Sequence, residues 1–261
     1  RVIRAISLFV LAASVTARVI QAVRTNARTQ ASLVKTAQTD ALTLLPNRSL
    51  MLKHIEEAVD SAWRTGKVPA VHFIDVDRFK NINDSLGHSA GDDVLVAVAQ
   101  RLTNAVPPSA IVGRISGDEF VVLEPNSIGD IEAMKTAERI LECFREPLAL
   151  KQGDVFVSAS IGVACSNGAE SPSPEELLRH ADAAMYRAKD AGRNCIALFD
   201  ASMLERATER LTLETALYRA LERQELTLVY QPIIDLQLGD VLGFEALMRW
   251  EREDGSTSSP A

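Results

Sequence analysis

The sequence predicts an α+β fold in which helices pack against a central sheet that contains an antiparallel hairpin. Residues 68–76 form a continuous apolar run with several β-branched side chains, which is typical of a strand buried on both faces. Two shorter apolar runs, at 110–115 and 120–123, lie on either side of a polar turn and predict the hairpin. Apolar side chains at helical spacing over 89–106 predict a helix between these strands.

The other helices and strands are predicted in the same way, from apolar residues at helical spacing and from short apolar runs. Further helices are expected at 128–145, 175–191 and 201–224, and further strands at 156–165, 195–199 and 226–234. Gly192 ends the helix before the last strand of the α+β domain. Three regions result: a helical connector at 1–38, the α+β domain at 39–200, and a linker helix with part of a second domain at 201–261.

Composition limits both the number of domains and the kind of ligand. A chain of 261 residues with 47% hydrophobic content has room for one full domain with helical extensions. The net charge of −7 argues against nucleic-acid binding by a basic surface, so an anionic ligand must be held by local positive groups. Cys143, Cys165 and Cys195 lie far apart in apolar surroundings, which predicts reduced core residues rather than zinc ligands or disulfides.

Residues 1–38 allow two interpretations. The apolar run at 5–17 is shorter than the roughly 20 residues that cross a bilayer, but it could end a transmembrane helix. Apolar residues at alternating spacings favour a coiled-coil-like connector instead. We favour the connector and expect a membrane or sensor segment before it. Any membrane contact then lies at or before residues 1–20, and the α+β domain is cytoplasmic.

A dense polar cluster follows the strand predicted at 68–76. Between residues 75 and 92 the sequence carries four acids, one lysine and two glycines. Carboxylate and carbonyl oxygens are the ligands that Mg²⁺ takes, together with phosphate oxygens, so this strand exit suits a hard cation. The alternative is a solvated loop in which Asp84 and Asp92 only cap helices.

A second acidic site, Asp118-Glu119, lies in the turn of the predicted hairpin. An isolated acid pair in a β-turn is usually no more than exposed charge. If the two strands are neighbours in one sheet, however, Asp75 and Asp118 can face the same metal, as phosphoryl-transfer sites with two metals require. Such chemistry needs cations on the phosphates, a positioned 3′-hydroxyl and little covalent participation by the protein.

Four ordered segments resemble the GGDEF family of diguanylate cyclase domains over residues 39–200. They are 40–48 (DALTLLPNR), 75–92, 114–120 (RISGDEF) and 181–194 (ADAAMYRAKDAGRN). The resemblance implies a nucleotidyl-cyclase palm-like fold. It also implies a homodimer in which two GTP molecules, one on each subunit, condense to cyclic di-GMP with loss of two pyrophosphates.

The resemblance further implies roles for single residues. Asp75 and Asp118 would bind Mg²⁺ or Mn²⁺ with help from the Val76 carbonyl. Glu119 would be a further ligand or would accept the proton of the 3′-hydroxyl. The implied substrate contacts are Asn83 and Asp92 to the guanine edge and Lys80, Lys189 and Arg193 to phosphates, with His88 beside the pocket. The alternative for the histidine is a loop residue hydrogen-bonded to backbone.

Two positions depart from the family pattern. Ser116 stands where the signature opens with a glycine, so a Cβ occupies a position that could need positive φ. Because every acid of the signature is retained, we favour an active cyclase. The alternative is a GTP-binding module, weak or inactive in turnover, that regulates a phosphodiesterase. Residues 107–110 read Pro-Pro-Ser-Ala where the family's product-inhibition site has Arg-x-x-Asp, so we expect that feedback to be absent.

The last part of the sequence carries a second resemblance. Residues 226–235 and 243–250 resemble the start of an EAL-type phosphodiesterase domain. Glu245 would bind metal there, and Gln231 and Arg249 would contact substrate. The alternative is an edge hairpin with a chance match. Because the other metal ligands and the general base of that family lie further along its domain, we expect no phosphodiesterase activity from these residues alone.

Overall fold

The computed structural model of this chain describes residues 18, 21, 38–150, 153–166, 172–251 and 257–258. The connector expected at 1–38 therefore lies almost entirely outside the described residues. The backbone divides into two units, one that ends at Asp200 and one that begins at Ala201, and each is described by itself. Among the helices described, none is long and apolar enough to cross a membrane.

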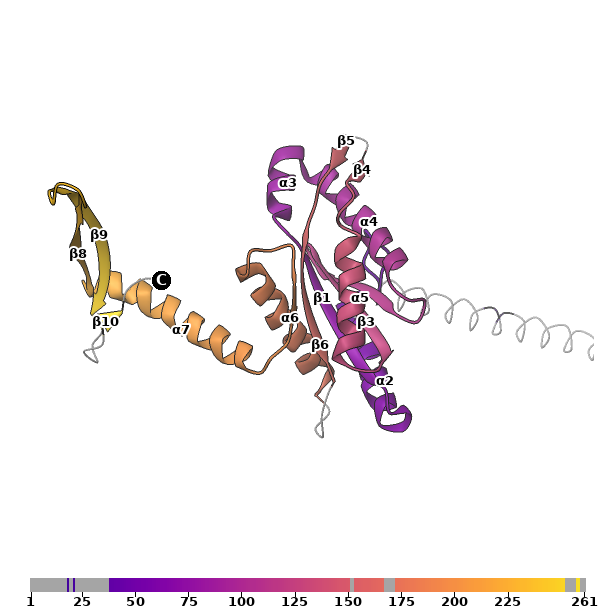
Figure 1. Ribbon diagram of the computed structural model, residues 1–261. Helices are drawn as coiled ribbons and strands as arrows, with labels where there is room; N and C mark the ends of the chain where they lie inside the picture. Colours follow the sequence, from indigo (N-terminus) through magenta and orange to yellow (C-terminus); the bar gives the residue numbers. More distant parts are fainter. Residues whose placement is uncertain are drawn as a thin grey trace, which may run out of the picture. The chain divides into compact units, whose positions relative to one another are not determined.

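A five-stranded mixed sheet forms the centre of the first unit (Figure 1). In sheet order the strands are β2 (Ile111–Ser116), β3 (Glu119–Ser127), β1 (Val68–Val76), β6 (Ala159–Cys165) and β7 (Ile196–Leu198). The central strand β1 pairs antiparallel with β3 and β6, whereas β6 and β7 are parallel. Every residue of β1 after Val68 is buried. The predicted α+β fold with its antiparallel hairpin is confirmed.

Helices cover both faces of this sheet. They are α2 (Arg48–Thr65), α3 (Phe79–Leu86), α4 (His88–Ala105), α5 (Asp130–Glu142) and α6 (Pro174–Asp190). Successive residues of β1 point to opposite faces of the sheet, and each face is covered by an apolar layer. Ala70, Ile74 and Val76 pack with buried side chains of α4 and α5. Val71 and Phe73 pack with buried side chains of α2 and α6. Because both faces of β1 are covered, its odd and even positions are both apolar.

Local sequence signals determine where two helices begin and how closely one of them packs. The Asn47 side chain accepts a hydrogen bond from the first turn of α2 and caps it. Ser173 and Glu176 form a capping box at the start of α6. At Gly162 of β6, a Cβ would overlap the backbone of α6, so only glycine permits this close approach. The contact holds α6, which carries Lys189, against the sheet.

Three sequence-based expectations for the first unit were wrong. No helix is predicted from sequence at 79–86, but these residues form α3, which buries Phe79 on one side and exposes most of its polar residues. The strand expected at 156–165 begins only at Ala159, and a short hairpin, β4 (Leu148–Leu150) with β5 (Gly153–Val155), precedes it. Both elements are too short to show a clear apolar period. The three cysteines are free thiols and half-buried rather than in the core.

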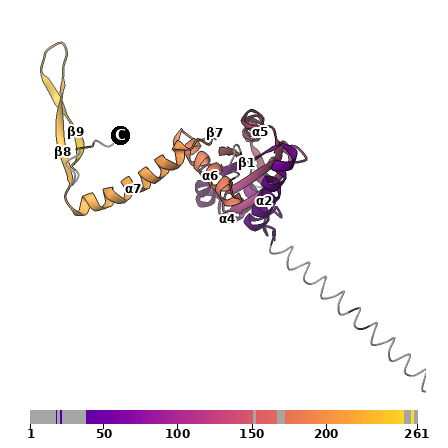
Figure 2. The ribbon, with the colours of Figure 1, turned by 90° about the horizontal axis from the view of Figure 1, so that it is seen from below.

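The second unit consists of a helix followed by a ribbon of strands. Its elements are α7 (Ser202–Glu222), β8 (Leu226–Ile234), β9 (Val241–Glu251) and β10 (Thr257–Ser258). α7 leads into the antiparallel pair β8 and β9 (Figure 2), in which Gln231 and Glu245 are Cα partners. The Trp250 indole donates to Glu225 Oε2 at 3.0 Å and joins the end of β9 to the residue before β8.

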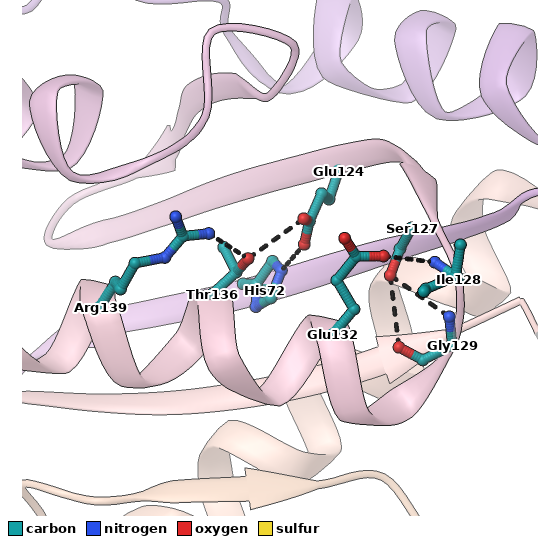
Figure 3. A network of polar contacts seen from close by, with 8 residues as sticks. All are labelled: His72, Glu124, Ser127, Ile128, Gly129, Glu132, Thr136 and Arg139. Atoms are coloured by element: carbon teal, nitrogen blue, oxygen red, sulfur yellow. Dashed lines mark hydrogen bonds and ion pairs between the residues drawn. The ribbon is translucent and has the colours of Figure 1, made fainter.

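A buried polar network lies between the sheet and α5 in the first unit (Figure 3). His72 on β1 is fully buried, and its Nε2 lies 3.3 Å from Glu124 Oε2 on β3. Thr136 on α5 donates to the other Glu124 oxygen at 3.1 Å, and Arg139 donates to the Thr136 hydroxyl at 2.8 Å. One carboxylate thus ties two strands to the helix that covers them.

Glu124→Ala should lower the free energy of unfolding by about 1–3 kcal/mol, because it leaves the buried His72 and Thr136 groups without their partner. Denaturant unfolding followed by circular dichroism measures this loss. Glu138→Ala, at an exposed position of the same helix, is the matched control and should change stability by no more than about 0.5 kcal/mol. Equal losses in the two variants would contradict the role of the network.

Candidate functional site

Acidic residues from two strands meet at one edge of the central sheet. Asp75, near the end of β1, is the Cα partner of Glu119, at the start of β3. Val76 N donates to the Asp118 carbonyl oxygen at 3.2 Å, so the hairpin turn lies directly beside the end of β1. The structure therefore brings together the four residues proposed from sequence as metal ligands, because the two strands are neighbours.

Asp75 is a strongly perturbed acid at this edge. Its side chain is 8% exposed, and burial raises the pKa of the carboxyl to about 6. The negative charges of Asp118 and Glu119 add to the increase, whereas the Lys189 ammonium, 2.6 Å from Asp75 Oδ2, opposes it. A carboxylate that is costly to ionise beside other carboxylates favours a cation among them.

The donor set at this edge fits Mg²⁺ or Mn²⁺, because it offers carboxylate and backbone carbonyl oxygens. Within the part of the chain that the structure describes, no three His, Cys, Asp or Glu side chains are grouped so as to hold a metal by themselves. Mg²⁺ usually keeps several waters and binds through one or two carboxylates together with substrate phosphates. An open pair of carboxylates, Asp75 and Asp118, therefore suits a metal that arrives with a nucleotide.

The three positive side chains expected from sequence to bind phosphates lie on α6, in the turn after it and on α3. Lys189 lies in the last turn of α6 and pairs with Asp75. Arg193 follows in the left-handed conformation, with φ of 68°, and lines a hollow of about 550 Å³ along α3. Lys80 is exposed in the first turn of α3, and no described contact ties it to the acidic edge.

Asp77 is a residue of this site that sequence reasoning left without a role. It is buried, and its carboxylate accepts hydrogen bonds from Ser158 Oγ at 2.7 Å, Ser160 Oγ at 2.6 Å and Asn194 N at 3.1 Å. These bonds tie the end of β1 to β6 and to the turn that carries Arg193. Asp77 therefore positions neighbouring elements. Its serine partners lie 81 and 83 residues further along the chain, so sequence alone did not reveal them.

Asn83 and Asp92 lie on neighbouring helices that approach closely. Asn83 is inside α3, and Asp84 and Asp92 are inside α3 and α4, so neither acid caps a helix as the alternative interpretation required. At Gly91 a Cβ would overlap Asn83 Oδ1, so the absence of a side chain lets Asn83 lie beside the first turns of α4. His88 is the exposed first residue of α4 rather than a loop residue.

The signature turn has its positive φ at Gly117, with a value of 44°, and not at Ser116, the last residue of β2. Positive φ is the conformation that glycine adopts freely and that strains residues with a Cβ. The serine therefore introduces no backbone strain into the turn. The glycine that the turn requires is the one the chain retains.

Arg114 holds this turn in place, a role that sequence reasoning did not assign although the residue stands in the quoted segment. Its Nε and Nη2 donate to the Gly117 carbonyl at 3.0 and 2.7 Å, and its Nη1 lies 2.9 Å from Asp40 Oδ1. Burial by itself would raise the pKa of Asp40. Hydrogen bonds from Thr43 and Arg114 have the larger combined effect, so the pKa lies below its ordinary value. The ion pair joins the turn to the segment before α2.

Comparison with protein families identifies this domain. The family model "Diguanylate cyclase, GGDEF domain" matches residues 37–195. This chain belongs to the GGDEF family. A second model, the EAL domain, matches residues 214–261, so the GGDEF domain is followed by a partial EAL domain.

Curated relatives match most of this chain. The bifunctional diguanylate cyclase/cyclic di-GMP phosphodiesterase MucR of Pseudomonas aeruginosa is 40% identical over 235 residues, which are 90% of this chain and 34% of MucR. The cyclic di-GMP phosphodiesterases NbdA of P. aeruginosa and PdeR of Escherichia coli are each 39% identical, over 84% and 89% of this chain and 28% and 34% of their own lengths. The chain thus spans about a third of the length of these relatives.

Solved structures of GGDEF domains match the first unit. The GGDEF domain of TpbB (YfiN) from P. aeruginosa gives a TM-score of 0.62 at 37% identity and covers 65% of this chain and 99% of that one. The coiled coil and GGDEF domain of DgcB from Caulobacter crescentus, in complex with cyclic di-GMP, gives 0.61 at 28% identity, over 71% of this chain and 99% of that one. The mixed sheet with its covering helices is the GGDEF fold.

The perturbed pKa of Asp75 predicts how stability depends on pH. Because the folded-state value of about 6 lies above the ordinary 3.8, the folded state binds the proton more tightly, and stability falls as pH rises from about 4 to about 6. Asp75→Asn should therefore be more stable than the parent by about 2 kcal/mol near neutral pH without divalent cations, and equally stable near pH 4.

Denaturant unfolding at the two pH values measures this difference. Asp60→Asn, at an exposed position of α2, is the matched control and should show no pH-dependent change relative to the parent. A loss of stability in Asp75→Asn near neutral pH would contradict the assigned cost of the charge.

Proposed function

We propose that this chain is a diguanylate cyclase whose GGDEF domain, residues 39–200, binds GTP with Mg²⁺ or Mn²⁺ and acts as a homodimer. The observation that carries the proposal is the meeting of Asp75, Asp118 and Glu119 at one sheet edge, with Lys189 paired to the buried aspartate. Acidic and basic groups side by side are what a metal-bound nucleotide requires. Membership of the GGDEF family supports the same substrate.

The proposed binding residues form two groups, one for the base and one for the phosphates of the nucleotide. We assign Asn83 and Asp92 to the guanine edge, because an amide and a carboxylate match its N–H groups and carbonyl. The close contact of α3 with α4 at Gly91 supports this assignment. We assign Lys80, Lys189 and Arg193 to the phosphates, and the guanidinium can bind in bidentate fashion. His88, exposed at the start of α4, borders the same helix pair.

The reaction needs two such sites, since each holds one GTP. The 3′-oxygen of one nucleotide forms a bond to the α-phosphorus of the other, and the bond from that phosphorus to the pyrophosphate oxygen breaks. The 3′-hydroxyl proton passes to Glu119. A bound divalent cation neutralises charge on the phosphates. Two equivalent steps give one cyclic di-GMP and two pyrophosphates, so a homodimer with facing sites is the active form.

A second candidate is a GTP-binding module with weak or no turnover that regulates a C-terminal phosphodiesterase. Two relatives that match this chain, NbdA and PdeR, are named cyclic di-GMP phosphodiesterases. The partial EAL domain and the pairing of Gln231 with Glu245 agree with such a protein. We favour the cyclase, because every acid of the signature is present and Ser116 causes no backbone strain.

Four further assignments accompany the cyclase. We assign residues 201–261 to a linker helix and the start of an EAL domain that is inactive by itself, and 1–38 to a connector that would carry any membrane contact. We place the GGDEF domain in the cytoplasm. Residues 107–110 form a turn in which Ala110 N donates to the Pro107 carbonyl at 2.9 Å. Without arginine or aspartate there, feedback by product at this position is not expected.

Incubation with GTP and Mg²⁺, with chromatographic analysis of products, tests the proposal. The parent should form cyclic di-GMP. Asp75→Asn and Asp118→Asn should each lower the rate about a hundredfold or more, because each removes a carboxylate from the metal edge. Asp60→Asn is the control and should retain parental activity.

Two results would overturn these assignments. Full activity in Asp75→Asn would remove this residue from the metal site. GTP binding without product in the parent, at concentrations that allow dimers, would reject the cyclase and leave the regulatory module.

Base recognition gives a separate prediction. GTP should bind about tenfold or more tightly than ATP, because adenine presents the opposite donor and acceptor pattern and would leave Asn83 and Asp92 without partners where the bound base covers them. Asn83→Ala should reduce this preference in calorimetry. Asn81→Ala, on the side of α3 that lines the hollow beside Arg193, is the matched control and should leave the preference unchanged. Equal affinities for GTP and ATP in the parent would exclude the guanine-reading role.

A further inference from the structure

Glu119 of the signature turn lies between two strands toward which its carboxylate can turn. It begins β3, and its Cα partners are Ser116 at the end of β2 and Asp75 near the end of β1. Directly opposed residues of an antiparallel sheet project to the same face. The three side chains therefore form a row across the sheet edge, with Glu119 in the middle. Its carboxylate can turn toward the proposed metal site on β1 or toward the serine on β2.

In this structure the carboxylate is turned toward the serine. The Ser116 hydroxyl donates a hydrogen bond of 2.6 Å to Glu119 Oε2. Both residues line a hollow of about 510 Å³, whereas Asp75 does not line it and is paired with Lys189 on α6. Within the described residues, no three acidic side chains are grouped so as to hold a metal by themselves. The carboxylates of Glu119 and Asp75 thus have separate partners.

The charge interactions of Glu119 agree with this position. Burial is the main cause of the raised pKa of Asp75, and the Glu119 charge adds less to it than the Asp118 charge does. Burial also raises the pKa of Asp182, which lines the hollow, and the Glu119 charge is the next cause there. The Glu119 carboxylate therefore acts on an acid in the hollow as well as on the buried aspartate of β1.

The serine hydroxyl is the specific restraint on this side of Glu119. The hollow is also lined by two arginines, Arg48 and Arg179, and by two further acids, Glu175 and Asp182, so these formal charges cancel. A hydrogen bond to a charged acceptor, in contrast, is directional and stronger than one between neutral groups. A glycine in place of the serine would have no side chain with which to make it.

We infer that Ser116 is a positioning residue that holds the Glu119 carboxylate away from Asp75 and Asp118 until a metal-bound nucleotide draws it back. This inference rests on the proposed function, in which Glu119 binds the metal or accepts the 3′-hydroxyl proton. Either role requires the carboxylate to leave the serine and turn toward β1. The apparent affinity for the metal is then lowered in proportion to the fraction of molecules in which Glu119 is turned away.

The affinity for Mn²⁺ in the presence of a GTP analogue with a methylene bridge between the α- and β-phosphorus tests this restraint without turnover. Electron paramagnetic resonance of free Mn²⁺ gives the dissociation constant, after correction for Mn²⁺ bound by the analogue alone. Ser116→Ala and Ser116→Gly should each tighten Mn²⁺ binding by about three- to tenfold, because both release Glu119. A variant that only damaged the fold would weaken binding instead. Ser116→Thr keeps the hydroxyl and should remain within about twofold of the parent.

A double-mutant cycle shows whether the effect passes through Glu119. In a Glu119→Ala background there is no carboxylate to restrain, so adding Ser116→Ala should change the Mn²⁺ affinity by no more than about twofold. Ser61→Ala is the control for loss of a hydroxyl elsewhere, because that group donates to the Ala58 carbonyl within α2. It should leave the Mn²⁺ affinity of the parent unchanged.

The outcomes separate this inference from the proposed function. Tighter binding in the alanine and glycine variants, lost in the Glu119→Ala background, supports the restraint. Unchanged or weaker binding in these variants, or the same gain without Glu119, would overturn it, and cyclic di-GMP formed by the parent from GTP would then still support the proposed function. The expected Mn²⁺ pattern without product from the parent would reject the cyclase and keep the restraint. No Mn²⁺ binding by the parent or by Ser116→Ala would overturn both.

Discussion

The antiparallel register between β1 and β3 is the constraint on which the site depends. It places Asp75 opposite Glu119 and brings the turn that holds Asp118 against the end of β1. A slip of one residue would send every side chain of β1 to the other face of the sheet. Since apolar layers cover both faces, such a slip would move Asp75 and the buried His72 into environments built for other side chains. Packing far from the site therefore fixes its geometry.

The acids at the sheet edge differ in the partners that surround them. Asp77 is surrounded by two serine hydroxyls and a backbone amide, so its bonding capacity is used within the protein. Asp75 is balanced by one ammonium group, which a phosphate can attract away. Glu119 is held by a single hydroxyl. The hydrogen-bonding capacity of Asp77 is thus used within the protein, whereas Asp75 and Glu119 have fewer partners, which agrees with the proposed metal site.

The helices supply the rest of the site through close approaches that only small residues permit. Gly162 lets α6 lie on β6 and so sets the position of Lys189, and Gly91 lets α3 lie on α4 with Asn83 between them. Arg114 and Asp40 then connect the signature turn to the segment that precedes α2. Arg114 N also donates to the Pro46 carbonyl at 2.9 Å, so two contacts join this segment to the strand before the turn.

Much of this protein was determined by its sequence alone: the α+β class, β1 and β8 with their bounds, the acidic edge as a candidate metal site, and the family to which the chain belongs. Those features rest on periodicity, on strand order and on residues close together along the chain. Three features required the tertiary structure: the partners of Asp77, the role of Arg114, and the position of positive φ at Gly117 rather than Ser116. Each depends on which distant segments meet or on backbone angles that side-chain identity does not set. The folded chain decides both, because packing on the two faces of β1 selects one arrangement among those that local preferences allow.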